Sequence, residues 1–246
     1  MTNKKQIGTN TEAYNKLIKY CEGKNYLSLE QIYGFLSDQG YSYSIDTIKK
    51  YLHNLKQSVL IFTAGRGFYS KIKNEFQPTP NDLNELIELI KTKYPLITFS
   101  IWSTKLLSPF FHHTQNQFYI FLYADKDSLI FLRDFLIENN FKAYLNPSIN
   151  DKNIVLQNNT VILRDYITRS KEENNISSIE KILVDFLIES EKLNLIDFAE
   201  YEKLFEAVIT GYRLNISYLI DYSGRRKVND TIQKLVIKYT NATLGK

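Results

Sequence analysis

Hydrophobic positions near the start of the chain recur at helical spacing. A first helix is predicted from about Thr11 to Glu22. A second begins at Ser28, where Gln31 three residues later has the spacing of a capping box, and Gly40 closes it. Both helices place apolar residues on one face, which predicts that they pack against a shared core.

The segment from Ser44 to Tyr69 combines a third, basic helix with a hairpin. Ser44 can cap this helix, whose apolar face is formed by Ile45, Ile48, Leu52 and Leu55. Residues 60–62 fit a short strand, and the glycines on either side of Arg66 allow a tight reversal. Three helices followed by a hairpin predict a winged helix-turn-helix with Arg66 at the tip of the wing.

The hydrophobic periodicity ends in residues 71–82, where two prolines and several polar residues interrupt it. We therefore expect one domain at 1–75 and a second at 76–246. In the second domain, helices are predicted near Leu83 and after Asp125. Strands are predicted at 97–102, 117–123 and 141–145, and as an antiparallel pair at 153–156 and 161–166.

From Ser177 to the end, four further apolar stripes predict helices alone. The predicted fold class is therefore α+β. A winged helix-turn-helix is followed by an α/β domain with a roughly four- to five-stranded sheet and by a C-terminal helical subdomain.

Charge is unevenly distributed between the two predicted domains. The chain carries a net charge of +4, with +5 in residues 1–75 and −1 in residues 76–246. Cations that displace condensed counterions provide much of the affinity for DNA. In the third helix, Thr47 and Lys50 are expected to approach base edges, and Lys49 and His53 the phosphates. The alternative is that these lysines form only a solvated helix face.

Several segments of the second half resemble one protein family. They are ITFSIWSTKLL (97–107), QFYIFLYADKDSLIFLRDFL (117–136), YLNPS (144–148), SIEKILVDFL (178–187) and ISYLIDYSGRRK (216–227). In this order they resemble AbiEi-like (type IV) antitoxins, the transcriptional regulators of abortive-infection systems.

The resemblance implies a DNA-binding antitoxin that represses its own promoter and opposes a nucleotidyltransferase-like toxin. It assigns DNA contacts to Ser44, Thr47, Lys50 and Arg66. Two alternatives remain open: a plain winged-helix regulator without a toxin partner, and an interaction protein that binds the toxin directly. An enzyme that modifies the toxin or a nucleotide would need converging acids, bases or phosphate-binding groups, and no such spacing is recognisable.

A second basic cluster, Arg225, Arg226 and Lys227, follows Gly224 in a predicted turn. It could meet nucleic acid, an acidic toxin surface or helix C-terminal carbonyls, or it could be solvated.

No residue pattern predicts catalysis, a cofactor or a metal site. His112 and His113 are adjacent and so point in different directions, and the single Cys21 is distant in sequence. Cys21 occupies an apolar helix position and is expected to be a core residue. The aromatic strand with Trp102 could stack bases, but core packing is the expected role. No apolar run approaches the ~18 residues that span a bilayer, so we expect a cytoplasmic protein without a membrane partner.

Overall fold

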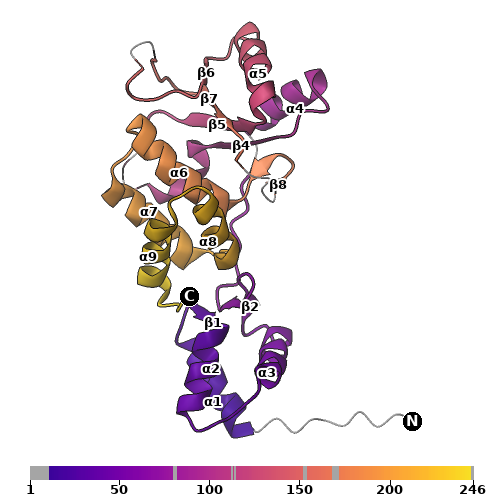
Figure 1. The fold of residues 1–246 in the computed structure, drawn as a ribbon, viewed down its shortest axis with the longest axis vertical. Helices are drawn as coiled ribbons and strands as arrows, with labels where there is room; N and C mark the ends of the chain where they lie inside the picture. The colour runs from indigo at the N-terminus through magenta and orange to yellow at the C-terminus, as the bar shows by residue number, and fades with distance from the viewer. Residues whose placement is uncertain are drawn as a thin grey trace, which may run out of the picture. The chain divides into compact units, whose positions relative to one another are not determined.

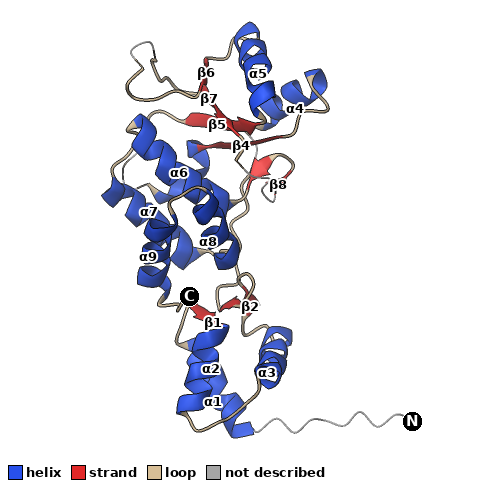
Figure 2. Ribbon diagram, in the orientation of Figure 1, coloured by secondary structure: helices blue, strands red, loops and turns tan. Residues whose placement is uncertain are grey.

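A computed structural model describes residues 11–79, 82–111, 113, 115–151, 154–167 and 172–244. It is a mixed α+β structure (Figures 1 and 2). The chain divides into two compact units. The first contains the described residues up to Glu75, together with Ile209–Ile220 and the segment from Asp230. The second contains Phe76–Val208 and Asp221–Asn229. The boundary after residue 75 lies where the prolines begin, but two stretches expected in the second domain belong to the first unit.

The first unit begins with three helices and a small sheet. The helices are α1 (Thr11–Glu22), α2 (Leu29–Asp38) and α3 (Ile45–Gln57). The antiparallel sheet has the order β1-β3-β2, with β1 at Tyr26–Ser28, β2 at Phe62–Thr63 and β3 at Phe68–Ser70. The sequence did not predict β1, because three residues are too few to show an alternating pattern.

The predicted caps of α2 and α3 are confirmed. The Ser28 side chain accepts from the Gln31 N–H, and the Gln31 side chain accepts from the Ser28 N–H. The Ser44 side chain accepts from the Thr47 N–H at 3.2 Å. These bonds satisfy amides that have no partner within the first turn of a helix.

The second unit contains a mixed sheet of order β6-β7-β5-β4-β9-β8 among the described residues. Its strands are β4 (Phe99–Ser103), β5 (Tyr119–Ala124), β6 (Ala143–Leu145), β7 (Thr160–Asp165), β8 (Glu172–Glu173) and β9 (Ile176–Ser177). Strands β4 and β5 are antiparallel, whereas β7 runs parallel to both β5 and β6.

The expected antiparallel pair at 153–156 and 161–166 is therefore wrong. Residues 154–156 form no strand, and Asn153 lies outside the described residues. The strand β7 was correctly located, but its neighbours are strands that precede it by many residues. Sequence proximity suggested a hairpin, whereas the hydrophobic content of β7 fits a central parallel strand that is buried on both faces.

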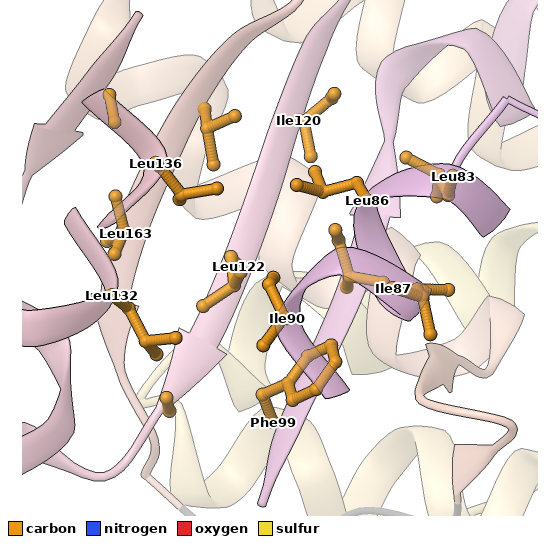
Figure 3. Close-up of a cluster of buried hydrophobic side chains, with 14 of the residues drawn as sticks. Leu83, Leu86, Ile87, Ile90, Phe99, Ile120, Leu122, Leu132, Leu136 and Leu163 are labelled. Carbon is orange, nitrogen blue, oxygen red and sulfur yellow. The ribbon is translucent and has the colours of Figure 1, made fainter. Parts of the chain in front are cut away.

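The two faces of the sheet have different partners. The helices α4 (Asn84–Lys93) and α5 (Lys126–Glu138) contribute to a hydrophobic core on one face (Figure 3). Because side chains alternate along a strand, Trp102, Phe121 and Tyr123 point to the opposite face. There, Trp102 contacts Phe186 of α6 (Ile179–Leu193), so α6 lies against this second face.

The remaining helices are α7 (Phe198–Gly211), α8 (Ile216–Arg225) and α9 (Asn229–Thr240). Together with α6 they match the four apolar stripes of the C-terminal region. A 3-10 helix, η1 (Thr104–Phe110), follows β4. Among the helices that the structure describes, none has the length and apolar character needed to cross a membrane.

Candidate nucleic-acid interface

Helix α3 presents one buried face and one basic face. Its buried residues are Ile48, Tyr51, Leu52 and Leu55. Ile45, which was expected in this stripe, is 52% exposed. Tyr51 is buried instead, with edge-to-face contacts to the rings of Tyr14 and Tyr43. The buried face is therefore rotated toward Tyr51 and away from Ile45.

The exposed face of α3 carries the residues expected to meet DNA. Lys49, Lys50 and His53 are exposed. Lys56, which sequence reasoning missed, is also exposed and lies one turn beyond His53. The side chains of the three lysines form no ion pair or hydrogen bond with any described residue. Asp46 is the one acidic residue within α3. The helix therefore offers a basic surface that no other part of the described chain neutralises.

The hydroxyl groups at the start of α3 are less available. Ser44 is exposed and Thr47 half-buried, and their side-chain oxygens lie 3.0 Å apart in a hydrogen bond. Each hydroxyl still has unused hydrogen-bonding capacity, because a hydroxyl is one donor and two acceptors. They can therefore bond to a phosphate or a base edge without breaking the cap.

Arg66 lies at the predicted hairpin tip, between Gly65 (φ +98°) and Gly67 (φ +78°). Its side chain is exposed. However, its backbone N–H donates to Ser217 Oγ at 2.9 Å, and the Ala64 carbonyl accepts from the Ile216 N–H at 2.9 Å. The tip is thus bonded to the start of α8, within the first unit.

The second basic cluster is not a continuous patch. Arg225 pairs with Asp221 at 2.6 Å, and Lys227 is exposed with φ +61°. The side chain of Arg226 is only 5% exposed, and its Nε lies 3.2 Å from Asp185 Oδ1. Burial alone would lower the pKa of Arg226, but the Asp185 carboxylate and nearby groups raise it overall. Arg226 is therefore a buried structural cation and cannot reach an external partner.

Asp185 belongs to a buried polar network between α6 and the sheet that sequence reasoning also missed. The network contains Lys181, Asp185 and Glu189, which are four residues apart on α6, together with Arg164 of β7. Asp185 accepts from Lys181 Nζ at 2.6 Å and from the Tyr222 hydroxyl at 2.9 Å. Glu189 forms a bidentate pair with Arg164, whose Nε and Nη2 donate to the two carboxylate oxygens. The spacing of charges along an otherwise apolar helix was the available signal.

The contacts of this network hold α6 and the sheet in one arrangement. Lys181 Nζ lies 3.7 Å from the ring centroid of Tyr123, a cation–π contact. Burial raises the pKa of Tyr123 well above its ordinary value, so its hydroxyl stays protonated. Paired charges of this kind hold elements in one arrangement, although desolvation offsets much of their attraction.

The remaining candidates offer no reactive group. Trp102 is fully buried and stacks on Phe121 with ring centroids 4.4 Å apart, so it belongs to the core. Cys21 is buried. In the described part of the chain, no three His, Cys, Asp or Glu residues lie together as a metal site would need. His113 is exposed, and His112 lies outside the described residues.

A small hollow of about 240 Å³ lies in the second unit. Aromatic and aliphatic side chains line it with Thr104 and three amide residues, Gln115, Asn116 and Gln117. None of its lining residues is charged at neutral pH, and the Tyr119 hydroxyl is the titratable group among them.

Comparison with known proteins assigns the chain to a family but indicates no activity. A family model described as a family of unknown function (DUF6577) matches residues 47–242. The match begins within α3 and ends just after α9. No curated protein matches the chain. Since the model covers well over half of its length, the chain belongs to the DUF6577 family.

Proposed function

We propose that residues 11–70 form a winged helix-turn-helix that binds double-stranded DNA through α3. The observation that supports the proposal is the exposed face of α3, where the side chains of Lys49, Lys50 and Lys56 have no partner among the described residues. A helix of this width fits the major groove of B-form DNA. The positive charge of the first 75 residues supports the same partner.

The residues of α3 take different parts in this binding. Thr47 and Lys50 face base edges, with Lys able to donate to guanine and the Thr methyl able to contact thymine. Lys49, His53 and Lys56 lie nearer the phosphates, which fix the position of the helix without reading sequence. Ser44 donates its hydroxyl to a phosphate at the start of the helix. The proposed function is binding, without catalysis.

The resemblance to AbiEi-like antitoxins extends this proposal to a biological role. The DNA would be the promoter of the chain's own operon, and the chain would oppose a nucleotidyltransferase-like toxin encoded beside it. A nucleotidyltransferase-like neighbouring gene whose toxicity is suppressed by co-expression of the full chain supports this role. Unchanged toxicity leaves a transcriptional regulator without a toxin partner.

DNA binding is tested by titrating a fluorescent duplex of the upstream promoter with the full-length protein at several salt concentrations. Replacing Lys49 and Lys50 by Ala should weaken binding and reduce the slope of log K against log salt by about 0.9 for each phosphate that is no longer neutralised. The matched control is the double variant Lys93→Ala and Lys126→Ala, which removes the same charge from exposed positions of the second unit. An equal decrease in affinity for both double variants would show that α3 is not the binding surface.

A further inference from the structure

One side of the β2–β3 hairpin tip is covered by residues 215–217, which are distant from it in sequence. Two hydrogen bonds join Ala64 and Arg66 to Ile216 and Ser217. The Asn215 side chain accepts from the Tyr218 N–H at 3.1 Å and bonds to Ser217 Oγ at 3.0 Å. The start of α8 therefore forms an ordered surface against the turn.

Gly65 shows how close this approach is. A Cβ atom at this position would lie 2.3 Å from Asn215 Oδ1, 2.4 Å from Ser217 Oγ and 2.9 Å from Ser217 N. Real side chains do not tolerate a separation below 3.0 Å. One side of the turn is thus filled by Asn215 and Ser217, and no groove edge can enter there.

The same segment is anchored below the hairpin tip. The fully buried Tyr26 of β1 donates its hydroxyl to the Tyr212 carbonyl at 2.8 Å and accepts from the Leu214 N–H at 2.9 Å. The guanidinium of Arg213 lies 4.7 Å from the ring centroid of Phe62 in β2. Leu214 and Ile216 are fully buried and hold residues 212–217 beside the hairpin in this unit.

The hairpin is also short. Only Phe62↔Ser70 and Thr63↔Tyr69 pair β2 with β3, so the paired region spans about 7 Å at 3.3 Å per residue. The next minor groove lies about half a helical turn, or roughly 17 Å, from the major groove that a recognition helix occupies. The paired strands are therefore short, and the tip that they present is already bonded to residues of its own chain.

We infer that this module reads DNA from the major groove alone, through α3. The hairpin tip packs against residues 215–217 of its own unit and does not enter the minor groove. The inference rests on the proposed DNA binding and specifies which features of the duplex are recognised. Specificity then depends on Thr47 and Lys50, while Arg66 contributes at most a phosphate contact. Gly65, Asn215 and Ser217 are positioning residues that hold the hairpin in place.

The test uses a duplex selected from a random library by the full-length protein. Guanines in the selected site are replaced one at a time by 7-deazaguanine, which removes the N7 acceptor from the major groove. In a second series they are replaced by inosine, which removes only the N2 amino group from the minor groove. We expect the first series to contain positions that lower affinity by about five-fold or more, and the second to remain within about two-fold.

Inosine effects as large as the 7-deazaguanine effects would overturn the inference. A second readout is the variant Arg66→Ala, which should keep the affinity within about two-fold and leave the effect of each base replacement on affinity unchanged. In Lys50→Ala, by contrast, the base replacements should have smaller effects on affinity. If inosine lowers the affinity of the unaltered protein but not that of Arg66→Ala, the hairpin contacts the minor groove. Affinity that is unchanged in both Lys50→Ala and the Lys49 and Lys50 double variant would instead contradict the proposed function itself.

Discussion

The hydroxyl of Tyr222 donates a 2.9 Å hydrogen bond to Oδ1 of Asp185, a carboxylate with no solvent exposure. The same carboxylate receives Lys181 Nζ at 2.6 Å and lies 3.2 Å from Arg226 Nε. Two cations from different parts of the second unit therefore depend on one buried anion. This dependence makes Asp185 the centre of the polar network on α6.

Replacing Asp185 by Asn should lower the free energy of unfolding by about 3–5 kcal/mol. The amide still accepts from Tyr222 but removes the negative charge that Lys181 and Arg226 share. Urea denaturation at neutral pH measures the decrease. The control is Asp221→Asn, which breaks the half-exposed pair with Arg225 and should cost no more than about 1 kcal/mol. Similar small decreases in both variants would show that the network does not need its anion.

Replacing Gly65 by Ala should destabilise the protein by about 1–3 kcal/mol. The added methyl would collide with Asn215 and Ser217, and φ of +98° disfavours any L side chain. The matched control is Gly34→Ala in α2, where the added Cβ meets no described atom within 4 Å apart from its chain neighbours and the backbone of its own helix. That variant should be more stable by about 0.5–1 kcal/mol, because alanine favours a helix interior. Opposite signs in thermal or urea denaturation are the expected result.

Val59 follows α3 with φ of +59°, although a β-branched residue is strained in this region. Seven of the other eight non-glycine residues with positive φ in the described chain are Asn. Val59 is 59% exposed, so its replacement gives up little burial. Val59→Asn should therefore raise the free energy of unfolding by about 1 kcal/mol. The reverse change at the end of α6, Asn194→Val, should lower it by about 1–2 kcal/mol. No gain from Val59→Asn would mean that the strain is relieved locally.

Cys21 should make stability depend on alkaline pH. Burial raises the pKa of its thiol from 9.0 to about 12, with a smaller contribution from Glu22. The unfolded thiol therefore ionises first, so stability is full below pH 9 and falls as pH rises toward about 12. Urea denaturation across this pH range should show that the free energy of unfolding declines less in Cys21→Ala than in the unaltered protein. The folded thiol should also resist alkylation at pH 8, and rapid labelling without denaturant would contradict its burial.

Local sequence signals located most elements. The capping residues Ser28 and Ser44 and the apolar stripes of α3 and α6 to α9 lie within the segments they specify, so the sequence alone contained the information. The strands β1, β8 and β9 were missed because two or three residues carry no readable period. The pairing of β7 was misassigned because parallel neighbours are distant in sequence.

Some features of the candidate site could likewise be predicted from the sequence, and others only from the structure. The exposed cations of α3 could be predicted from helical spacing, because a residue opposite a buried stripe must face outward. Arg226 could not be separated from Arg225 and Lys227, since only its position beside Asp185, 41 residues earlier in the sequence, shows that it is buried. The hydrogen bond between the Arg66 backbone N–H and Ser217 could likewise not be predicted, because Ser217 is 151 residues away.

By itself, the sequence determined where helices begin and end, which faces are apolar, and that the first 75 residues carry the positive charge. The tertiary structure decided which strands pair, which cations remain free, and that residues 212–217 complete the unit containing α3. The physical reason is that caps and amphipathic stripes depend on neighbours a few residues apart. Desolvation, ion pairing and backbone approach at Gly65 depend on residues that only folding brings together.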